Sequence, residues 1–175
     1  MSALKKVGIG IAIVLAAIVI VGLLLPAEYS AERSTIIDAP ITEVFAQVDD
    51  LERYNTWSPW AERDPDIELT YSDQTVGLGA WYSWKGEVNG TGKLTITKSL
   101  ANERIETELD FGDMGAAHGW WTFEQTDAGV KVTWGFRGDS GWNLFERYMG
   151  LMMDRMVGPD FERGLSNMKA QLEGT

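Results

Sequence analysis

The hydrophobic positions of this chain fall into three successive patterns, each typical of a different kind of element. From Val7 to Leu25 every residue is uncharged and most are aliphatic. From Tyr29 to Arg137 hydrophobic and polar residues alternate in short runs, as in strands with one buried face. From Trp142 to Leu172 hydrophobic residues recur at spacings of three and four, which predicts one long helix with a single apolar stripe.

The first pattern predicts a transmembrane anchor over residues 7–25. At about 1.5 Å per residue, this run just crosses a hydrocarbon core of about 30 Å. Lys5 and Lys6 precede it, and Glu28 and Glu32 follow it. Because positive residues favour the inner side, we expect residues 1–6 in the cytoplasm and the following domain on the extracytoplasmic side of a single-pass membrane protein.

A cleaved signal peptide is the alternative interpretation of the same run. Signal peptides have a shorter apolar core, of about 7–15 residues, and small residues before the cleavage site. Here the core is longer, and Leu25 stands where a small residue is needed for cleavage before Glu28. The pattern therefore favours the uncleaved anchor.

The alternating region predicts an antiparallel meander with two helical turns near its start. We predict a strand over residues 29–37, a helix over 41–50 and one further helical turn over 51–54. Residues 55–66 are expected to be a loop because Pro59 and Pro65 interrupt them. Further strands are predicted over 67–72, 79–85, 87–100, 103–111, 115–125 and 130–137.

The long C-terminal helix is the element expected to cover the apolar face of this sheet. In the last strand Val130, Val132, Trp134 and Phe136 alternate with polar residues, so one face is apolar and the other meets water. The segment 157–159 (Val-Gly-Pro) is expected to kink or break the helix, with Asp160 capping its second half.

Several segments resemble the polyketide cyclase/dehydrase family of the helix-grip (SRPBCC/START-like) superfamily. Residues 36–60 are similar to its entry segment, 77–96 to its glycine-rich middle strands, 129–138 to its penultimate element and 161–173 to its terminal helix. This resemblance, over about residues 29–173, implies an α+β helix-grip domain at 26–175. In that fold a curved antiparallel sheet of about seven strands wraps around the long C-terminal helix. The superfamily includes START lipid-binding domains, cyclases and hydrolases, so it indicates fold more than function.

The resemblance also implies an apolar cavity between the sheet and the helix. An ordinary packed core would use the same residue types, so each candidate has that alternative. The candidate ligand-binding residues are Trp81 or Trp84, Leu109, Phe111, His118, Trp120, Trp134, Phe136, Phe145, Met149, Met152 and Met156. Trp57 and Trp60 are expected either to close the pocket mouth or touch a membrane, or else to fix their loop to the core.

Few residues offer catalytic chemistry. The chain has no cysteine, which excludes disulfides and thiol catalysis, and His118 is its one histidine. His118 is the catalytic candidate, with a carboxylate or Tyr82 as partner, and its parity with Trp120 would place it facing the cavity. We expect no metal, because a zinc site here would have only carboxylates beside the single histidine, which is an uncommon ligand set. We expect no cofactor, because the sequence has no GxGxxG motif opening a helix and no phosphate-binding loop.

The net charge narrows the possible partners. It is −11 for the whole chain, and −13 once Lys5 and Lys6 are set apart. So acidic a domain argues against nucleic acid. The preferred hypothesis is a membrane-tethered protein that binds an apolar small molecule or lipid. A cyclase/dehydrase-like enzyme and a ligand-free interaction module for a membrane partner are the alternatives, and the sequence specifies no oligomeric state.

Overall fold

Within the described part of the chain, seven strands form one antiparallel sheet in the order β1-β7-β6-β5-β4-β3-β2. The computed structural model describes residues 3–174. Strands β2 to β7 follow one another as a meander. The last of them, β7, pairs with the first strand of the chain, β1, so that Ile37 lies opposite Val130. The strands are β1 (Glu28–Ile37), β2 (Glu68–Tyr71), β3 (Trp81–Lys85), β4 (Thr91–Leu100), β5 (Arg104–Asp110), β6 (Ala116–Thr126) and β7 (Gly129–Asp139).

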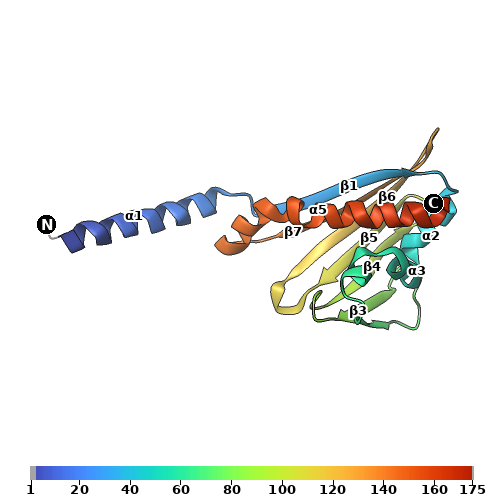
Figure 1. Ribbon diagram of the computed structural model, residues 1–175, viewed down its shortest axis with the longest axis horizontal. Helices are drawn as coiled ribbons and strands as arrows, with labels where there is room; N and C mark the ends of the chain where they lie inside the picture. The colour runs from blue at the N-terminus through green and yellow to red at the C-terminus, as the bar shows by residue number, and fades with distance from the viewer. Residues whose placement is uncertain (1–2, 175) are drawn as a thin grey trace.

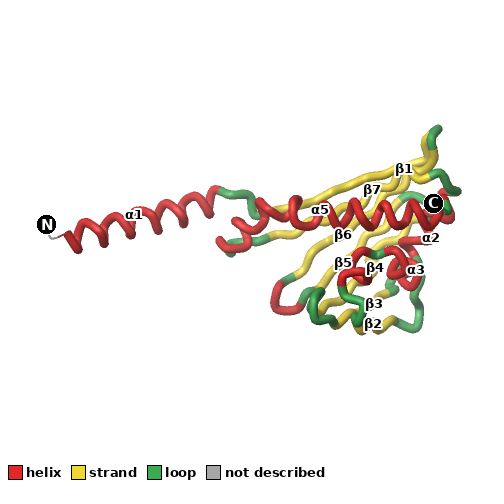
Figure 2. Tube along the Cα trace, viewed as in Figure 1, coloured by secondary structure: helices red, strands yellow, loops and turns green. Residues whose placement is uncertain are grey.

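The long C-terminal helix lies along the sheet, as Figure 1 shows. The predicted helix-grip fold, a curved sheet around a C-terminal helix, is thereby confirmed. Figure 2 shows two of the shorter helices, α2 and α3, close to the C-terminal end of the long helix. The helices are α1 (Ala3–Leu24), α2 (Ile41–Asp49), α3 (Leu51–Trp57), α4 (Pro59–Arg63), the 3-10 turn η1 (Gly112–Met114) and α5 (Leu144–Glu173).

Residues 55–66, which were expected to form a loop, are largely helical. The Asp50 carboxylate caps α3 by accepting from the backbone N–H groups of Glu52 and Arg53, at 3.0 and 3.4 Å. Pro59 occupies the start of α4. A proline is tolerated there because the first N–H of a helix has no partner within the helix. The loop prediction was therefore wrong for most of this segment.

Helix α5 runs without a break through Pro159. Of the predicted kink or break at 157–159, the break is therefore wrong, as is the predicted cap at Asp160, and the kink stays a prediction. Asp160 instead forms an ion pair with Arg63 of α4. Gly158 packs against the Arg33 guanidinium of β1, so a side chain at this position would require Arg33 to move.

The apolar positions of α5 form two stripes on different faces. Phe161, Leu165 and Met168 are almost fully buried against the sheet. Phe145, Met152 and Met156, by contrast, are 73%, 53% and 52% exposed. Met156 and Phe161 are five residues apart, which turns a helix by about 500° and so moves the stripe about 140° around the axis. The prediction of a single stripe overlooked this spacing.

An aromatic cluster joins α3 to the sheet in the core. Trp57 is 2% exposed, and its indole N–H donates to the Gln47 carbonyl at 3.1 Å. The Trp121 and Trp134 rings stack with centroids 4.4 Å apart, and Tyr54 meets both edge-on. Trp57 therefore fixes its segment to the core.

Candidate functional site

A cavity of about 330 Å³ lies between the inner face of the sheet and helices α3, α4 and α5. Most of its wall is apolar, and every strand from β2 to β7 contributes to it. The lining residues are Tyr54, Asn55, Trp60, Ala61, Arg63, Ile67, Leu69, Tyr82, Trp84, Val88, Asn89, Leu94, Thr107, Leu109, Phe111, Gly119, Trp121, Trp134, Phe136, Val157 and Phe161.

Five of the residues selected from the sequence line this cavity. They come from strands β3, β5 and β7 and from the turn after β5, and they are Trp84, Leu109, Phe111, Trp134 and Phe136. The Trp84 and Phe111 rings meet edge to face with centroids 5.8 Å apart. Trp134 stacks on Phe161 of α5, which brings the sheet and the helix together at the cavity wall. Their part in ligand binding stays a prediction.

Trp81, His118 and Trp120 lie on the outer face of the sheet. Inward-pointing residues alternate along a strand, and in β6 these are Gly119, Trp121 and Phe123. His118 and Trp120 have the opposite parity, so placing them in the cavity was wrong. Trp81 packs beneath the Lys93 ammonium, 4.3 Å from its ring centroid, outside the cavity wall.

The four candidates from the first half of α5 also lie outside the cavity wall. Phe145, Met149, Met152 and Met156 precede the change of face at Phe161 and point away from the sheet. Val157 and Phe161 supply the helix side of the wall instead. The prediction that these methionines line the cavity was wrong, because it treated the apolar residues of α5 as a single stripe.

The polar part of the cavity wall was missed at the sequence level. Tyr54 and Tyr82 are 4% and 5% exposed, and Thr107 is also buried. Tyr82 and Trp84 share one parity in β3, a pattern that could have separated Trp84 from Trp81. Tyr54 lies in α3, at the end of the segment predicted as a single extra turn.

The two buried tyrosines are neutral hydrogen-bonding groups. Burial raises the pKa of both the Tyr54 and the Tyr82 hydroxyl above the ordinary value of 10.0, since it disfavours the phenolate. Both phenols therefore stay protonated near neutral pH. Of the described residues that line the cavity, only Arg63 carries a charge, and none is a histidine or a carboxylate.

Helix α4 and the turn between β3 and β4 form one rim of the cavity. Asp64 is 5% exposed, and its Oδ2 accepts from the backbone N–H groups of Val88 and Asn89, at 3.0 and 3.1 Å. The Asn89 side-chain amide donates to the Trp60 carbonyl at 2.7 Å. These bonds hold the turn, with its exposed Val88, against α4.

A second hollow, of about 240 Å³, lies on the outer face of the sheet and contains His118 and Trp120. It is polar, with Arg104 paired to Glu106 at 2.7 Å, which lowers the Glu106 pKa. Within residues 3–174, no group of three or more His, Asp or Glu side chains is placed to hold a metal ion. Because this hollow lies on the outer face of the sheet, the thickness of the sheet separates His118 from the cavity.

The chain belongs to the polyketide cyclase/dehydrase and lipid transport family, whose model matches residues 29–173. The structure had already defined a helix-grip protein with an internal apolar cavity. Among curated proteins, none matches this chain.

Solved structures with the same fold share little sequence with it. A protein of unknown function from Staphylococcus aureus is 12% identical, with a TM-score of 0.63 over 84% of this chain and 94% of that one. A protein from Chromobacterium violaceum is 13% identical, with a TM-score of 0.61 over 83% of this chain and 98% of that one. The di-domain ARO/CYC StfQ of the steffimycin biosynthetic pathway is 13% identical, with a TM-score of 0.62 over 85% of this chain and 51% of that one. At these identities the likeness shows a shared fold.

Proposed function

We propose that this protein is anchored in a membrane by α1 and binds one small apolar molecule in the cavity between the sheet and α5. The observation that carries the proposal is the cavity wall, which is apolar and aromatic with a few neutral hydrogen-bonding groups. Such a wall suits a ligand that is mostly hydrocarbon and carries an acceptor for a phenol. A volume of about 330 Å³ is at the lower end of the usual range for ligand sites, about 300–1,000 Å³.

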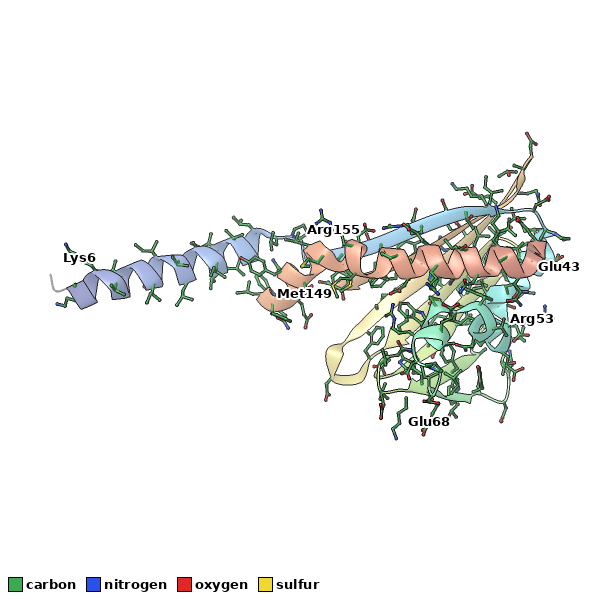
Figure 3. All side chains as sticks on the ribbon, in the orientation of Figure 1. Lys6, Glu43, Arg53, Glu68, Met149 and Arg155 are labelled. Carbon is green, nitrogen blue, oxygen red and sulfur yellow. The ribbon has the colours of Figure 1, made fainter. Side chains whose placement is uncertain are left out.

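The features of α1 support the anchor. Residues 5–24 form a helix long and apolar enough to cross a bilayer. Of its residues whose burial is described, only Gly22 is buried, so α1 is unlike the core helix of a soluble domain. Figure 3 shows its side chains projecting on all sides of a helix that extends away from the sheet. With Lys5 and Lys6 on the cytoplasmic side, the cavity lies on the opposite side of the membrane.

An enzyme of the cyclase/dehydrase type is the second candidate, and the two buried phenols favour it. A neutral tyrosine can donate a hydrogen bond to a substrate carbonyl and stabilise developing negative charge. The described wall positions include no carboxylate or histidine to act as a general base, and the Arg63 guanidinium forms an ion pair with Asp160. Binding without reaction is therefore the better-supported proposal.

Native mass spectrometry of the full chain, released from detergent micelles, tests the proposal. We expect the protein to carry one bound molecule, seen as a stoichiometric extra mass, and we expect extraction of the protein with an organic solvent to release that molecule. Leu109→Trp should remove this mass by filling the cavity, whereas Leu100→Trp, at an exposed position 43% accessible, should retain it. A bare wild-type mass, or equal retention in both variants, would reject the cavity as the binding site.

A further inference from the structure

The turn before α5 and the first half of this helix carry a set of apolar side chains, most of which are exposed. We call Trp142, Phe145, Met149, Met152 and Met156 the α5 stripe. Trp142 and Phe145 are the most exposed members, at 83% and 73%. A continuous exposed apolar surface on a small domain usually marks a contact with a membrane or a partner.

Contacts with α1 fix the position of this stripe relative to the proposed anchor. The Tyr148 hydroxyl donates to the Ile18 carbonyl at 2.7 Å. Nη1 of Arg147 donates to the carbonyls of Leu23 and Leu25, at 2.9 and 3.0 Å. Carbonyls at the end of a helix have no partners within it, so Arg147 acts as a side-chain cap for α1.

These bonds place the start of α5 beside the last two turns of α1, as Figure 1 shows. Ile18 and Leu25 are separated by about 10 Å along the axis, at about 1.5 Å per residue. If α1 spans the bilayer, its last two turns lie at the edge of the hydrocarbon core. Trp142 and Phe145 are then held at that same depth.

We infer that Trp142 and Phe145 insert into the interface of the bilayer and form a second membrane contact beside α1. This inference rests on the proposed anchor. The bilayer is the fitting occupant because the stripe begins where the span ends, and because tryptophan collects at the depth of lipid headgroups. The charge of −13 beyond Lys6 favours a zwitterionic over an anionic lipid surface.

The second contact sets the height of the cavity above the membrane. Val157, on the cavity wall, follows Phe145 by twelve residues of continuous helix, or about 18 Å. Because α5 continues roughly in the direction of α1, as Figure 1 shows, this length of helix separates the cavity wall from the proposed interface.

Spin labels test this geometry directly, because the chain has no native cysteine. Trp142→Cys and Phe145→Cys are labelled separately in the full chain, which is reconstituted into phosphatidylcholine vesicles. Each variant keeps the other aromatic residue. We expect several-fold less collision with a water-soluble nickel complex, and more with oxygen, than at the reference Leu78→Cys. Leu78 is an exposed apolar residue of the β2–β3 connection, 64% accessible.

A label at Ile13→Cys, in the middle of α1, separates the two proposals. Lipid exposure at Ile13 with water exposure at both Trp142 and Phe145 overturns this inference and leaves the anchor in place. Water exposure at Ile13 overturns the anchor itself. Spin labels at Phe145→Cys could also broaden one another magnetically, with the broadening lost on dilution with unlabelled chain. That result would mean that the α5 stripe contacts a second copy of the protein, which also overturns the inference.

Discussion

The indole ring of Trp134 on β7 stacks on the phenyl ring of Phe161 on α5, with centroids 4.0 Å apart and planes inclined by 14°. Both rings are buried and both form part of the cavity wall. Gly164, three residues further along α5, allows this approach, because a Cβ there would lie 2.8 Å from Trp134 Cζ3. The pair therefore packs α5 against the sheet and also forms part of the cavity wall.

Removing one ring of this stack should destabilise the folded protein. Phe161→Ala is expected to lower the free energy of unfolding by about 3–5 kcal/mol, the usual cost of deleting a buried phenylalanine. Urea unfolding followed by near-ultraviolet circular dichroism measures the change. Phe145→Ala removes the same atoms from an exposed site on the same helix and should cost less than about 0.5 kcal/mol. Equal losses in the two variants would contradict the assigned burial.

The ion pair between Arg33 and Asp154 predicts a pH dependence. Arg33 holds Asp154 at 2.7 Å and lowers its pKa below the ordinary value of 3.8. A lowered folded-state pKa stabilises the protein at pH values above the unfolded pKa, and this contribution is lost as the pH falls through the folded one. Stability should therefore fall below about pH 4.

Asp154→Asn isolates this contribution to the acid dependence. The variant should be less stable than the wild type at pH 6, and the difference should shrink below pH 4. Asp73→Asn is the matched control at an exposed carboxylate. Urea midpoints measured from pH 3 to pH 7 would contradict the assignment if the Asp154→Asn difference were constant with pH.

The buried Asp64 should control access to the cavity. Asp64→Ala leaves the Val88 and Asn89 N–H groups without their acceptor, which costs about 1–3 kcal/mol locally. The turn between β3 and β4 should then open more often, and hydrogen exchange of these two amides should speed up. Exchange in the β6–β7 hairpin serves as the internal reference. An unchanged rate at Val88 and Asn89 would show that Asp64 does not hold the rim.

The sequence predicted the elements better than it predicted which side chains meet. Alternation in β5 and β7 is unambiguous, so the meander and its inner face follow from the pattern. In β6 two tryptophans are adjacent, and hydrophobicity alone cannot say which one points inward. Phe123 settles the question, since it shares its parity with Trp121 and is buried with it. His118 was misplaced with Trp120 for this reason.

Helix α5 shows a second limit of sequence patterns. Its apolar residues keep spacings of three and four within each stripe, from Phe145 to Met156 on the exposed face and from Val157 to Leu172 on the face toward the sheet. The change of face is therefore a single irregular step between Met156 and Val157. Such a step has little weight in a pattern averaged over the whole helix. It decides, however, which residues line the cavity and which form the α5 stripe.

The cavity assignment predicts different effects at Tyr82 and His118. Tyr82→Phe removes a protonated phenol from the wall, and loss of one hydrogen bond should weaken retention of a ligand that carries an acceptor by up to about tenfold. His118→Ala changes a side chain on the outer face and should leave retention unchanged. Native mass spectrometry of the loaded full chain compares both with the wild type. A loss at His118 that exceeds the loss at Tyr82 would move the site to the outer hollow.

The contact between α1 and α5 depends on the absence of a side chain at Gly22. A Cβ at this position would lie 2.9 Å from Leu144 Cδ2 and 3.0 Å from Tyr148 Cε2. Gly22→Leu should therefore push α5 away and break the hydrogen bond from Tyr148 to Ile18. The sheet lies away from this contact, so its fold should be unaffected.

Pulsed spin-label distances measure this uncoupling in reconstituted full-length protein. Labels at Leu15→Cys on α1 and Leu151→Cys on α5, both exposed positions, should give a narrow distance distribution in the otherwise unchanged chain. Gly22→Leu should broaden it, because the two helices then move independently. Gly10→Leu, where a Cβ has nothing within 4 Å, makes the same substitution on α1 and should leave the distribution narrow. A distribution that stays narrow with Gly22→Leu would mean that the connection through Pro26, rather than the helix contact, fixes the domain on its anchor.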